Sequence, residues 1–301
     1  MASIKQVCGS TFCIVTGSMH IPFYKLKSGE IVLMDSGFPH EGDEIQAALE
    51  AEGLRVRAIL TSHVHYDHVG NHTRFRTAYG AEVYMSAYDA GIAQTPLTLQ
   101  ACFYANSVSE IEATYPYMVC RADHTLPAET GTVTIDEATF TILHLPGHSH
   151  CHWGYVTPDE VAYVGDLLMG EADLEATSLL FGQDWRETLR SIDRLCTTDF
   201  RAYILAHSDV VEDVQTLARR NREAILGQME WVLSFLKDWK SRQEVTALMI
   251  RERCRRADKA RVRMISRFAA AALNYLEDTG ALEFQVEDGV LYYRKAQERD
   301  A

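Results

Sequence analysis

The sequence predicts an α/β protein that carries a smaller helical unit at its C-terminal end. Over the first two thirds of the chain, strand-like and helix-like patterns alternate, which is typical of sheets covered by helices. From about residue 212 the pattern becomes helical and closes with a hairpin. Residues 1–219 hold 13 Lys and Arg against 29 Asp and Glu, whereas residues 220–301 hold 16 against 13. We therefore expect one domain over 1–219 and a second over 220–301.

The first half of the larger domain shows strand patterns separated by two helix patterns. Residues 41–52 place apolar side chains such as Ile45 and Leu49 at the spacing of one helix face. A second helix is expected from near Gly70 to a point before Gly80. Apolar runs that end in small or polar residues predict strands at residues 11–15, 31–35, 57–61 and 82–85.

Residues 95–120 interrupt this rhythm. Two prolines and several aromatic residues mark an insertion that is expected to be partly helical. Its tyrosines, Tyr104, Tyr115 and Tyr117, either roof a substrate pocket or fill the core of the insertion. After the insertion, strands are expected at residues 132–135, 139–143, 153–156, 161–164 and 202–205, with a helix at 185–197.

The C-terminal segment has the pattern of helices followed by a hairpin. Two alternating apolar runs, at residues 282–286 and 290–293, flank the sequence Glu287-Asp288-Gly289. Asp-Gly between such runs is a strong short-range hairpin signal. The helices that precede it are expected at residues 212–240, 244–257 and 261–278. Helices followed by a two-stranded wing describe a winged helix.

The composition is that of a soluble globular enzyme, with 47% hydrophobic and 24% charged residues. No apolar stretch approaches the roughly 18 residues that a membrane-spanning helix needs. The N-terminus lacks a signal-peptide pattern, and the seven cysteines are scattered without a CxxC pair. These features predict a cytoplasmic protein with reduced thiols. The acidic main domain argues against the phosphate backbone of nucleic acid as its primary ligand.

A histidine-rich motif follows the strand expected at residues 57–61. His63, His65, Asp67 and His68 fall within six residues, which is hard to justify structurally. His63 and His65 lie on one side of an extended turn, so both imidazoles can reach one ion. Asp67 and His68 fall on the adjacent turn and can face a second ion. Imidazole and carboxylate ligands without thiolate suit zinc, iron or manganese.

Further ligand-type residues stand singly at the ends of other expected strands. His148 lies in Pro-Gly-His-Ser, Asp166 in Gly-Asp and His207 in Ala-His-Ser. Asp35, in Asp-Ser-Gly, has the same position after its strand but offers only one carboxylate. Taken in order with the histidine-rich motif, these residues predict a metal centre built from the ends of several strands.

The order of these motifs, DSG, HxHxDH, GHS, GD and a late histidine, resembles the metallo-β-lactamase superfamily. The resemblance spans residues 11–208 and is closest to the glyoxalase II-like arm, which has a dinuclear site. It implies an αββα sandwich, in which two sheets pack face to face with helices outside. It also implies two divalent metal ions as cofactors, zinc in the first place, with iron or manganese as alternatives.

The resemblance implies a role for each ligand-type residue. The first ion would be held by His63, His65 and His148, the second by Asp67, His68 and His207, and both by Asp166. Class B β-lactamases usually lack the bridging aspartate, so its presence argues against antibiotic hydrolysis.

The expected nucleophile is a hydroxide that bridges the two metal ions, because a dication lowers the pKa of bound water to about 7. The resemblance implies that Asp67 is the catalytic proton shuttle once the hydroxide has attacked. Asp35 is a candidate for fixing the orientation of a ligand histidine, and His20 for facing the substrate. His152 is interpreted as a packing residue.

The C-terminal segment carries a second resemblance. Residues 272–282 and 288–293 resemble the winged-helix appendix of the lactamase-β-2-like branch. That branch includes single-strand-specific RNA endonucleases and thioesterases that act on carrier-bound acyl chains. The basic run at residues 251–263 is interpreted as a solvated helix face that pairs with the acidic body. A nucleic-acid surface is less favoured, because no aromatic residues interleave for base stacking.

We therefore expect a dinuclear metal-dependent hydrolase that cleaves an ester, thioester or lactone of a small or carrier-bound acyl compound. Three alternatives stay open. They are a single-stranded RNA endonuclease or phosphodiesterase, an iron-dependent oxygenase of the persulfide dioxygenase kind, and a transcriptional regulator that uses the winged helix. No membrane partner is expected, nucleic acid is the less favoured ligand, and a homodimer rests on family analogy alone.

Overall fold

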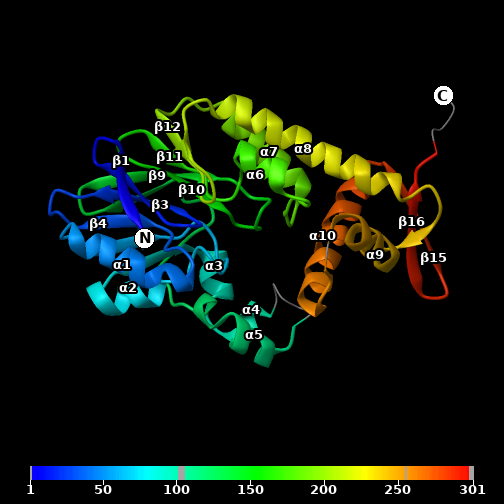
Figure 1. The fold of residues 1–301 in the computed structure, drawn as a ribbon, viewed down its shortest axis with the longest axis horizontal. Helices are drawn as coiled ribbons and strands as arrows, with labels where there is room; N and C mark the ends of the chain where they lie inside the picture. The colour runs from blue at the N-terminus through cyan, green and yellow to red at the C-terminus, as the bar shows by residue number, and fades with distance from the viewer. Residues whose placement is uncertain (1, 101–105, 255, 298–301) are drawn as a thin grey trace.

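The computed structural model describes residues 2–100, 106–254 and 256–297, and the described strands form three sheets (Figure 1). The first sheet has the strand order β1-β2-β3-β4-β5-β6-β7. It is antiparallel as far as β4 and parallel from β4 to β7. Its strands are β1 (Ser3–Cys8), β2 (Thr11–Val15), β3 (His20–Lys25), β4 (Ile31–Met34), β5 (Val56–Leu60), β6 (Glu82–Ser86) and β7 (His124–Leu126).

The second sheet has the strand order β13-β12-β11-β10-β9-β8. Only the pair of β11 and β12 is parallel within it, and the other neighbours are antiparallel. Its strands are β8 (Thr132–Ile135), β9 (Ala138–His144), β10 (Trp153–Val156), β11 (Val161–Tyr163), β12 (Ala202–Ile204) and β13 (Val210–Val211).

The two large sheets pack face to face around one core. Phe23 and Leu33 of the first sheet belong to the same buried cluster as Phe140 and Tyr155 of the second. Burying such side chains removes apolar area from water at about 25 cal/mol per Å², which favours the sandwich. Outside the sheets lie helices α1 (Gly42–Ala51) and α2 (His72–Tyr79) on one side and α7 (Trp185–Leu195) on the other (Figure 1). This arrangement confirms the predicted α/β class.

Short helices follow β6, and those after the first make up the predicted insertion at residues 95–120. A proline or a serine or threonine cap begins each of them, which satisfies backbone N–H groups at the helix start. They are α3 (Ala87–Ile92), α4 (Pro96–Leu99), α5 (Val108–Thr114) and the 3₁₀ turn η2 (Pro116–Met118). A second 3₁₀ turn, η1 (Pro39–Glu41), precedes α1, and α6 (Glu171–Ala176) follows β11.

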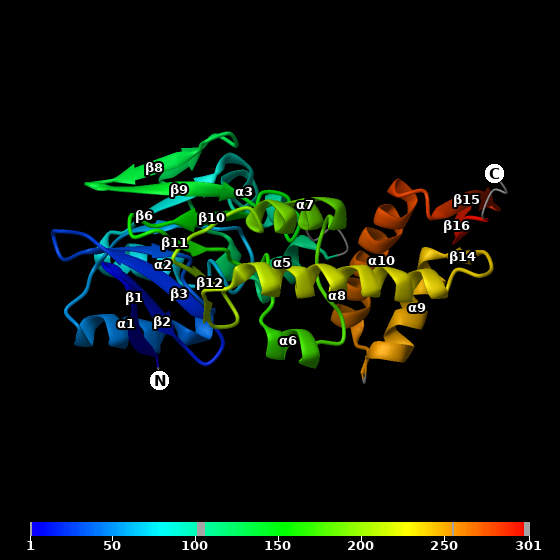
Figure 2. The ribbon, with the colours of Figure 1, turned by 90° about the horizontal axis from the view of Figure 1, so that it is seen from above.

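The C-terminal part consists of helices and a small sheet (Figure 2). Its elements are α8 (Val214–Ser234), β14 (Lys240–Ser241), α9 (Arg242–Arg253), α10 (Lys259–Asp278), β15 (Leu282–Glu287) and β16 (Val290–Lys295). A second hydrophobic cluster runs from the second sheet through α7 and α8 to α9 and α10. The predicted boundary at residue 219 falls inside α8, and the division into two domains stays a prediction.

The predicted hairpin is confirmed. β15 and β16 are joined by Asp288 and Gly289, both at positive φ, as a two-residue hairpin turn of the primed type requires. The first C-terminal helix ends at Ser234 rather than at residue 240, because Lys240 and Ser241 pair with β16.

Several strands had no clear sequence signal. β1, β7 and β13 are exposed or short, and β3 contains Pro22, a residue that weakens a strand prediction. None of the helices in the described parts of the chain combines the length and apolar character needed to cross a membrane.

Candidate metal centre

The histidine-rich motif lies directly after β5, in the middle of the first sheet. β4, β5 and β6 run parallel, so their carboxyl ends meet at one edge. Asp35 follows β4, and residues 62–68 follow β5 at this edge. The first sheet therefore supplies the four ligand-type residues of the motif together with the Asp35 carboxylate.

The second sheet supplies the remaining ligand-type residues. β9, β11 and β12 run in the same direction, because β9 and β11 are both antiparallel to β10 and β12 is parallel to β11. His148 follows β9, Asp166 follows β11 and His207 follows β12. All seven predicted ligands are thus brought together where the two sheets meet at one end of the sandwich.

The first set of ligands is His63, His65, His148 and Asp166, whose ligand atoms lie within 4.8 Å of one another. His65 Nδ1 is 2.7 Å from His63 Nε2 and 3.0 Å from His148 Nε2. Asp166 Oδ2 is 3.1 Å from His148 Nε2. Three imidazole nitrogens and one carboxylate oxygen therefore converge on one point.

The second set is Asp67, His68, Asp166 and His207, again within 4.8 Å. His207 Nε2 lies 3.0 Å from Asp67 Oδ2 and 3.4 Å from Asp166 Oδ1. The same Asp166 oxygen lies 3.2 Å from His68 Nε2. Because Asp166 directs Oδ2 to the first set and Oδ1 to the second, its carboxylate connects the two sets.

The protonation states of the first set suit metal binding. Burial lowers the pKa of His63 and His65 well below its usual range, and neighbouring imidazoles lower it further. Both rings are therefore neutral at pH 7 and have lone pairs to offer, as a metal ligand must. In the second set, His68 Nε2 and Asp166 Oδ1 are buried and lie 3.2 Å apart, but this close contact lacks hydrogen-bond geometry, and neither atom has another hydrogen-bond partner among the described residues. Such atoms are rare in folded proteins unless an ion or water contacts them.

The second set has an excess of negative charge. Asp35 Oδ2 lies 2.7 Å from His68 Nδ1, and Asp166 and Asp67 lie on its Nε2 side. Burial alone would lower the pKa of His68, but these three carboxylates raise it well above its usual range. Burial alone would also lower the pKa of His207, but the nearby carboxylates of Asp166 and Asp67 outweigh burial and raise this pKa to about 10. The surroundings favour a positive charge at this point, and a divalent cation fits the donor set.

Asp35 occupies the position expected of a group that orients a ligand. It is fully buried and has a positive φ of 64°, which brings its side chain under the histidine-rich loop. It accepts hydrogen bonds from the Ser62 N–H at 2.7 Å, the Ser62 hydroxyl at 2.5 Å and the Tyr163 hydroxyl at 2.7 Å. With His68 Nδ1 as a fourth donor, Asp35 fixes the ring so that Nε2 faces the second set.

Other residues that support the loop had no sequence signal. His72 bonds the Ser36 hydroxyl at 2.7 Å and the Thr61 hydroxyl at 2.8 Å, and burial lowers its pKa to about 4. Asp89 accepts a hydrogen bond from the Val64 N–H, which lies between two ligands. The contacts of His72 and of Asp89 that support the loop join residues 11 to 36 positions apart, so no local signal in the sequence marks this supporting role.

The structure places His20 at the start of β3, after the turn that follows β2. Its backbone N–H donates to the Ala206 carbonyl, and its Nε2 lies 3.9 Å from Asp209 Oδ1. His20 is not among the residues that line the pocket beside the metal centre, and its role toward substrate stays a prediction. His152 is fully buried, as its packing interpretation requires, and its Nε2 accepts the Asp166 N–H at 3.1 Å.

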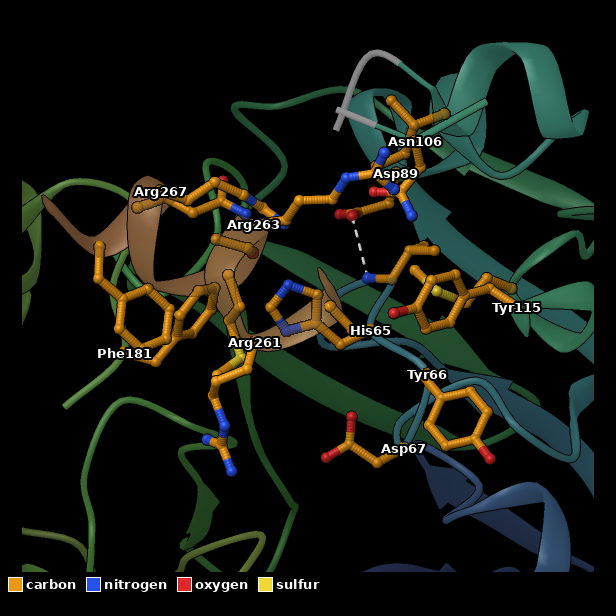
Figure 3. A pocket seen from close by; sticks show the side chains of 18 of the residues that line it. His65, Tyr66, Asp67, Asp89, Asn106, Tyr115, Phe181, Arg261, Arg263 and Arg267 are labelled. Atoms are coloured by element: carbon orange, nitrogen blue, oxygen red, sulfur yellow. Dashed lines mark hydrogen bonds between the residues drawn. The ribbon is translucent and has the colours of Figure 1, made fainter. Parts of the chain in front are cut away.

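A pocket of about 600 Å³ opens beside the two sets (Figure 3). His65 and Asp67 line it, and Tyr115 of the insertion faces it. Tyr117 is 51% exposed and does not line it, and Tyr104 lies outside the described residues. The pocket is the size of a small-molecule site and has metal-ligand residues in its wall.

The fold and the two linked ligand sets define a metal-dependent hydrolase of the metallo-β-lactamase class. The chain belongs to the metallo-beta-lactamase superfamily, whose family model matches residues 24–207. That match covers the residues between β3 and His207, which include both ligand sets.

Individual relatives are distant. Hydroxyacylglutathione hydrolase GloC of Haemophilus influenzae is 29% identical over 129 residues, which are 42% of this chain and 57% of that protein. The lactamase-like protein ptaB of Pestalotiopsis fici is 30% identical over 172 residues, 56% of this chain and 44% of that protein. The chain thus spans about half the length of these two relatives.

A solved structure extends the likeness of fold to nearly the whole chain. A beta-lactamase domain protein from Burkholderia ambifaria matches with a TM-score of 0.74 at 18% identity. The match covers 97% of this chain and 93% of that one, so it includes the C-terminal helices.

Proposed function

We propose that the protein is a dinuclear metal-dependent hydrolase that cleaves an ester, thioester or lactone bond of a small or carrier-bound acyl compound. The observation that carries the proposal is the carboxylate of Asp166, which connects two ligand sets at the wall of a pocket. The distant likeness to a hydroxyacylglutathione hydrolase supports an acyl thioester as one substrate class.

The ligand sets say which residues would hold the ions. They are His63, His65 and His148 for the first ion, Asp67, His68 and His207 for the second, and Asp166 for both. We propose zinc for both positions, because histidine and carboxylate donors without cysteine suit zinc, with iron and manganese as alternatives. When bound, such ions make a water nucleophilic near neutral pH and polarise the scissile carbonyl.

The protein's own groups position the reactants and move the proton. Asp67 belongs to the second set and also lines the pocket, so it touches both the ligands and the substrate space. Burial alone would raise the pKa of Asp67, but His68 and His207 lower it to about 2, which keeps the carboxylate ionised. The proposed role rests on position: the ionised Asp67 carboxylate lies at both the ligand set and the pocket, where it can accept the proton of the attacking water and return it to the leaving group. Asp35 holds the His68 ring in place during these steps.

Two further assignments complete the proposal. The order α9, α10, β15, β16 supports a winged-helix unit at the C-terminal end, and the pairing of β14 with β16 adds a third strand to its sheet. The six cysteines among the described residues form no disulfide, which supports a reducing, cytoplasmic location.

Elemental analysis combined with a substrate panel tests the proposal. We expect plasma mass spectrometry of the purified protein to find two equivalents of zinc per chain. The same sample should hydrolyse members of a panel of esters, thioesters and lactones, and a chelator should abolish this activity. A single iron per chain with oxygen consumption on a persulfide would replace the hydrolase by an oxygenase. Cleavage of single-stranded RNA that weakens steeply with salt, without acyl hydrolysis, would replace it by an endonuclease.

A further inference from the structure

The pocket beside the metal centre has apolar walls. Phe181 contacts the first ligand set, with its ring centroid 5.7 Å from His65 and 4.9 Å from His148. The same ring lies 5.1 Å from Phe268 of α10, so one aromatic surface runs from the ligands to the C-terminal helix. Met118 of the insertion adds to the lining. An apolar segment of a substrate next to the scissile bond would fit here.

One face of α10 completes the pocket. Residues 260, 261, 263, 264, 267 and 268 line it, a spacing that places them on a single side of a helix. Three of them are arginines, Arg261, Arg263 and Arg267, and in Figure 3 Arg263 extends toward Asp89 and Asn106 whereas Arg261 points away from them. Three cationic side chains beside an apolar cavity stand out in a chain of net charge −13.

The charges around these arginines differ. Arg263 Nη1 lies 3.0 Å from Glu110 Oε2 of α5, so its charge is offset within the protein. Arg261 has no ion-pair partner among the residues that the structure describes, and it is exposed at the pocket. Three acidic groups line the pocket. Asp67 lies 3.0 Å from His207 in the second ligand set, Asp258 accepts the Arg261 backbone N–H as the cap of α10, and the buried Asp89 accepts the Val64 N–H. None of these contacts engages the Arg261 guanidinium.

We propose that the pocket takes an acyl ester or thioester whose apolar chain ends in an anionic group, a carboxylate or a phosphate, and that Arg261 recognises this group. The inference rests on the proposed hydrolase function and names its substrate class. Arginine suits the role, because its planar guanidinium can pair with both oxygens of a carboxylate or phosphate. The cavity of about 600 Å³ is matched to a small molecule, which favours a small acyl compound over a nucleic-acid strand.

A matched pair of substrates tests the proposal. N-acetylcysteamine thioesters of straight acyl chains are compared with thioesters of the same chains that end in a carboxylate. We expect the charged series to have the higher kcat/KM, by about tenfold or more, since a charge-assisted hydrogen bond contributes about 1.5–3 kcal/mol. In Arg261→Gln this preference should fall by about tenfold, mainly through KM. Arg261→Lys keeps the positive charge but loses the planar guanidinium. Its preference for the charged series should therefore lie between that of the wild type and that of Arg261→Gln.

Arg251→Gln is the matched control. Arg251 is exposed on α9 and is not among the residues that line the pocket, so the same loss of charge there should leave the preference unchanged. A wild-type protein that hydrolyses both series equally well would overturn the anionic substrate while leaving the hydrolase function standing. If Arg261→Gln lowers kcat/KM for both series by an equal factor, recognition of the anionic group by Arg261 is likewise overturned and the hydrolase function stands.

A binding measurement tests the anion site independently of the proposed hydrolase function. Calorimetry with the non-hydrolysable thioether analogue of the charged substrate should show binding that is about tenfold weaker in Arg261→Gln. If no acyl compound is hydrolysed but this difference appears, the hydrolase function fails and the anion site stands. If the analogue does not bind, while a single-stranded oligonucleotide binds in a manner that depends on Arg261, the small anionic substrate is wrong.

Discussion

At the scale of single residues, Asp166 connects the two ligand sets, and its surroundings explain how it can. Its Oδ2 faces His148 and its Oδ1 faces His68, while its backbone N–H donates to His152. The preceding Gly165 has a φ of 52°, and a Cβ at that position would lie 2.5 Å from His152 Nε2. A glycine here therefore allows His152 to approach and fix the aspartate.

Asp166→Asn should uncouple the two sets. Asparagine keeps the shape of the side chain but removes its charge and turns one oxygen into an N–H donor, which repels a cation. We expect bound metal to fall from two equivalents to one or fewer and kcat to fall by more than about 100-fold, beyond the loss typical of groups that merely support a ligand. Plasma mass spectrometry and turnover measure these effects, and circular dichroism checks the fold.

Asp238→Asn is the control for this variant, because Asp238 is exposed in the segment between α8 and β14. It removes the same charge without touching either set, and both metal content and turnover should stay at the wild-type level. Two equivalents of metal together with full turnover in Asp166→Asn would contradict the bridging assignment.

At the scale of elements, an ion-pair cluster joins the insertion to the C-terminal part beside the pocket. Glu110 of α5 pairs with Lys259 and with Arg263, both on α10. This contact agrees in part with the interpretation of the basic run as a helix face paired with acidic groups. It links the two elements on which the shape of the pocket depends, since α10 and Tyr115, the residue after α5, both line the cavity.

The pKa of the Glu110 carboxyl should lie far below that of an ordinary glutamate. The hydrogen bond from Lys259, then the Ser107 N–H and Arg263, lower the pKa of Glu110 from 4.5 to about 2. Because the pKa is lower in the folded state, the carboxylate stabilises the docking of α5 on α10 above pH 4.5. That contribution is lost as the pH falls from 4.5 to about 2. Carboxyl NMR measures the titration, with the resonance identified through Glu110→Gln.

Glu112→Gln provides the comparison on the same helix. Glu112 is exposed, and its removal should leave the Glu110 titration in place. Added salt should move the Glu110 midpoint upward, because exposed ion pairs are screened beyond a Debye length of about 8 Å at physiological ionic strength. A Glu110 midpoint near 4.5 in low salt would show that the cluster does not form in solution.

At the scale of the whole molecule, the metal centre joins the two halves of the sandwich. His63, His65 and their neighbours in the motif come from the first sheet, whereas His148, Asp166 and His207 come from the second. A bound ion would therefore be held by residues from both sheets at one end of the core. Since the ligands are assembled only in the folded chain, metal binding should favour the folded state.

Metal removal should lower the thermal stability of the protein. For a ligand present at 1,000 times its Kd the stabilisation is about 4 kcal/mol, which for a chain of this size corresponds to a fall in Tm of about 6 °C. Calorimetry of the metal-loaded and chelated protein measures the shift, and re-addition of zinc should reverse it. The chelated sample must first be shown to be free of metal by mass spectrometry. Equal Tm values for the two forms would mean that the ions do not join the sheets.

The sequence determined the class of the fold and the identity of the ligand-type residues. The α/β pattern and the Asp288-Gly289 hairpin were readable because periodicity and turn chemistry act over a few residues. The motif from His63 to His68 was readable for the same reason: its spacing alone is distinctive. His148, Asp166 and His207 became predictable through their order along the chain and their positions after strands.

Only the tertiary structure decided which groups support the ligands and what surrounds the substrate space. The Tyr163 hydroxyl reaches Asp35 from 128 positions along the chain, and Asp89 of α3 accepts the Val64 N–H from 25 positions away. Arg261 faces the pocket because α10 returns to the metal centre after the long helix α8. These contacts depend on how sheets and helices pack, and packing depends on the whole core. No local pattern in the sequence could therefore have revealed them.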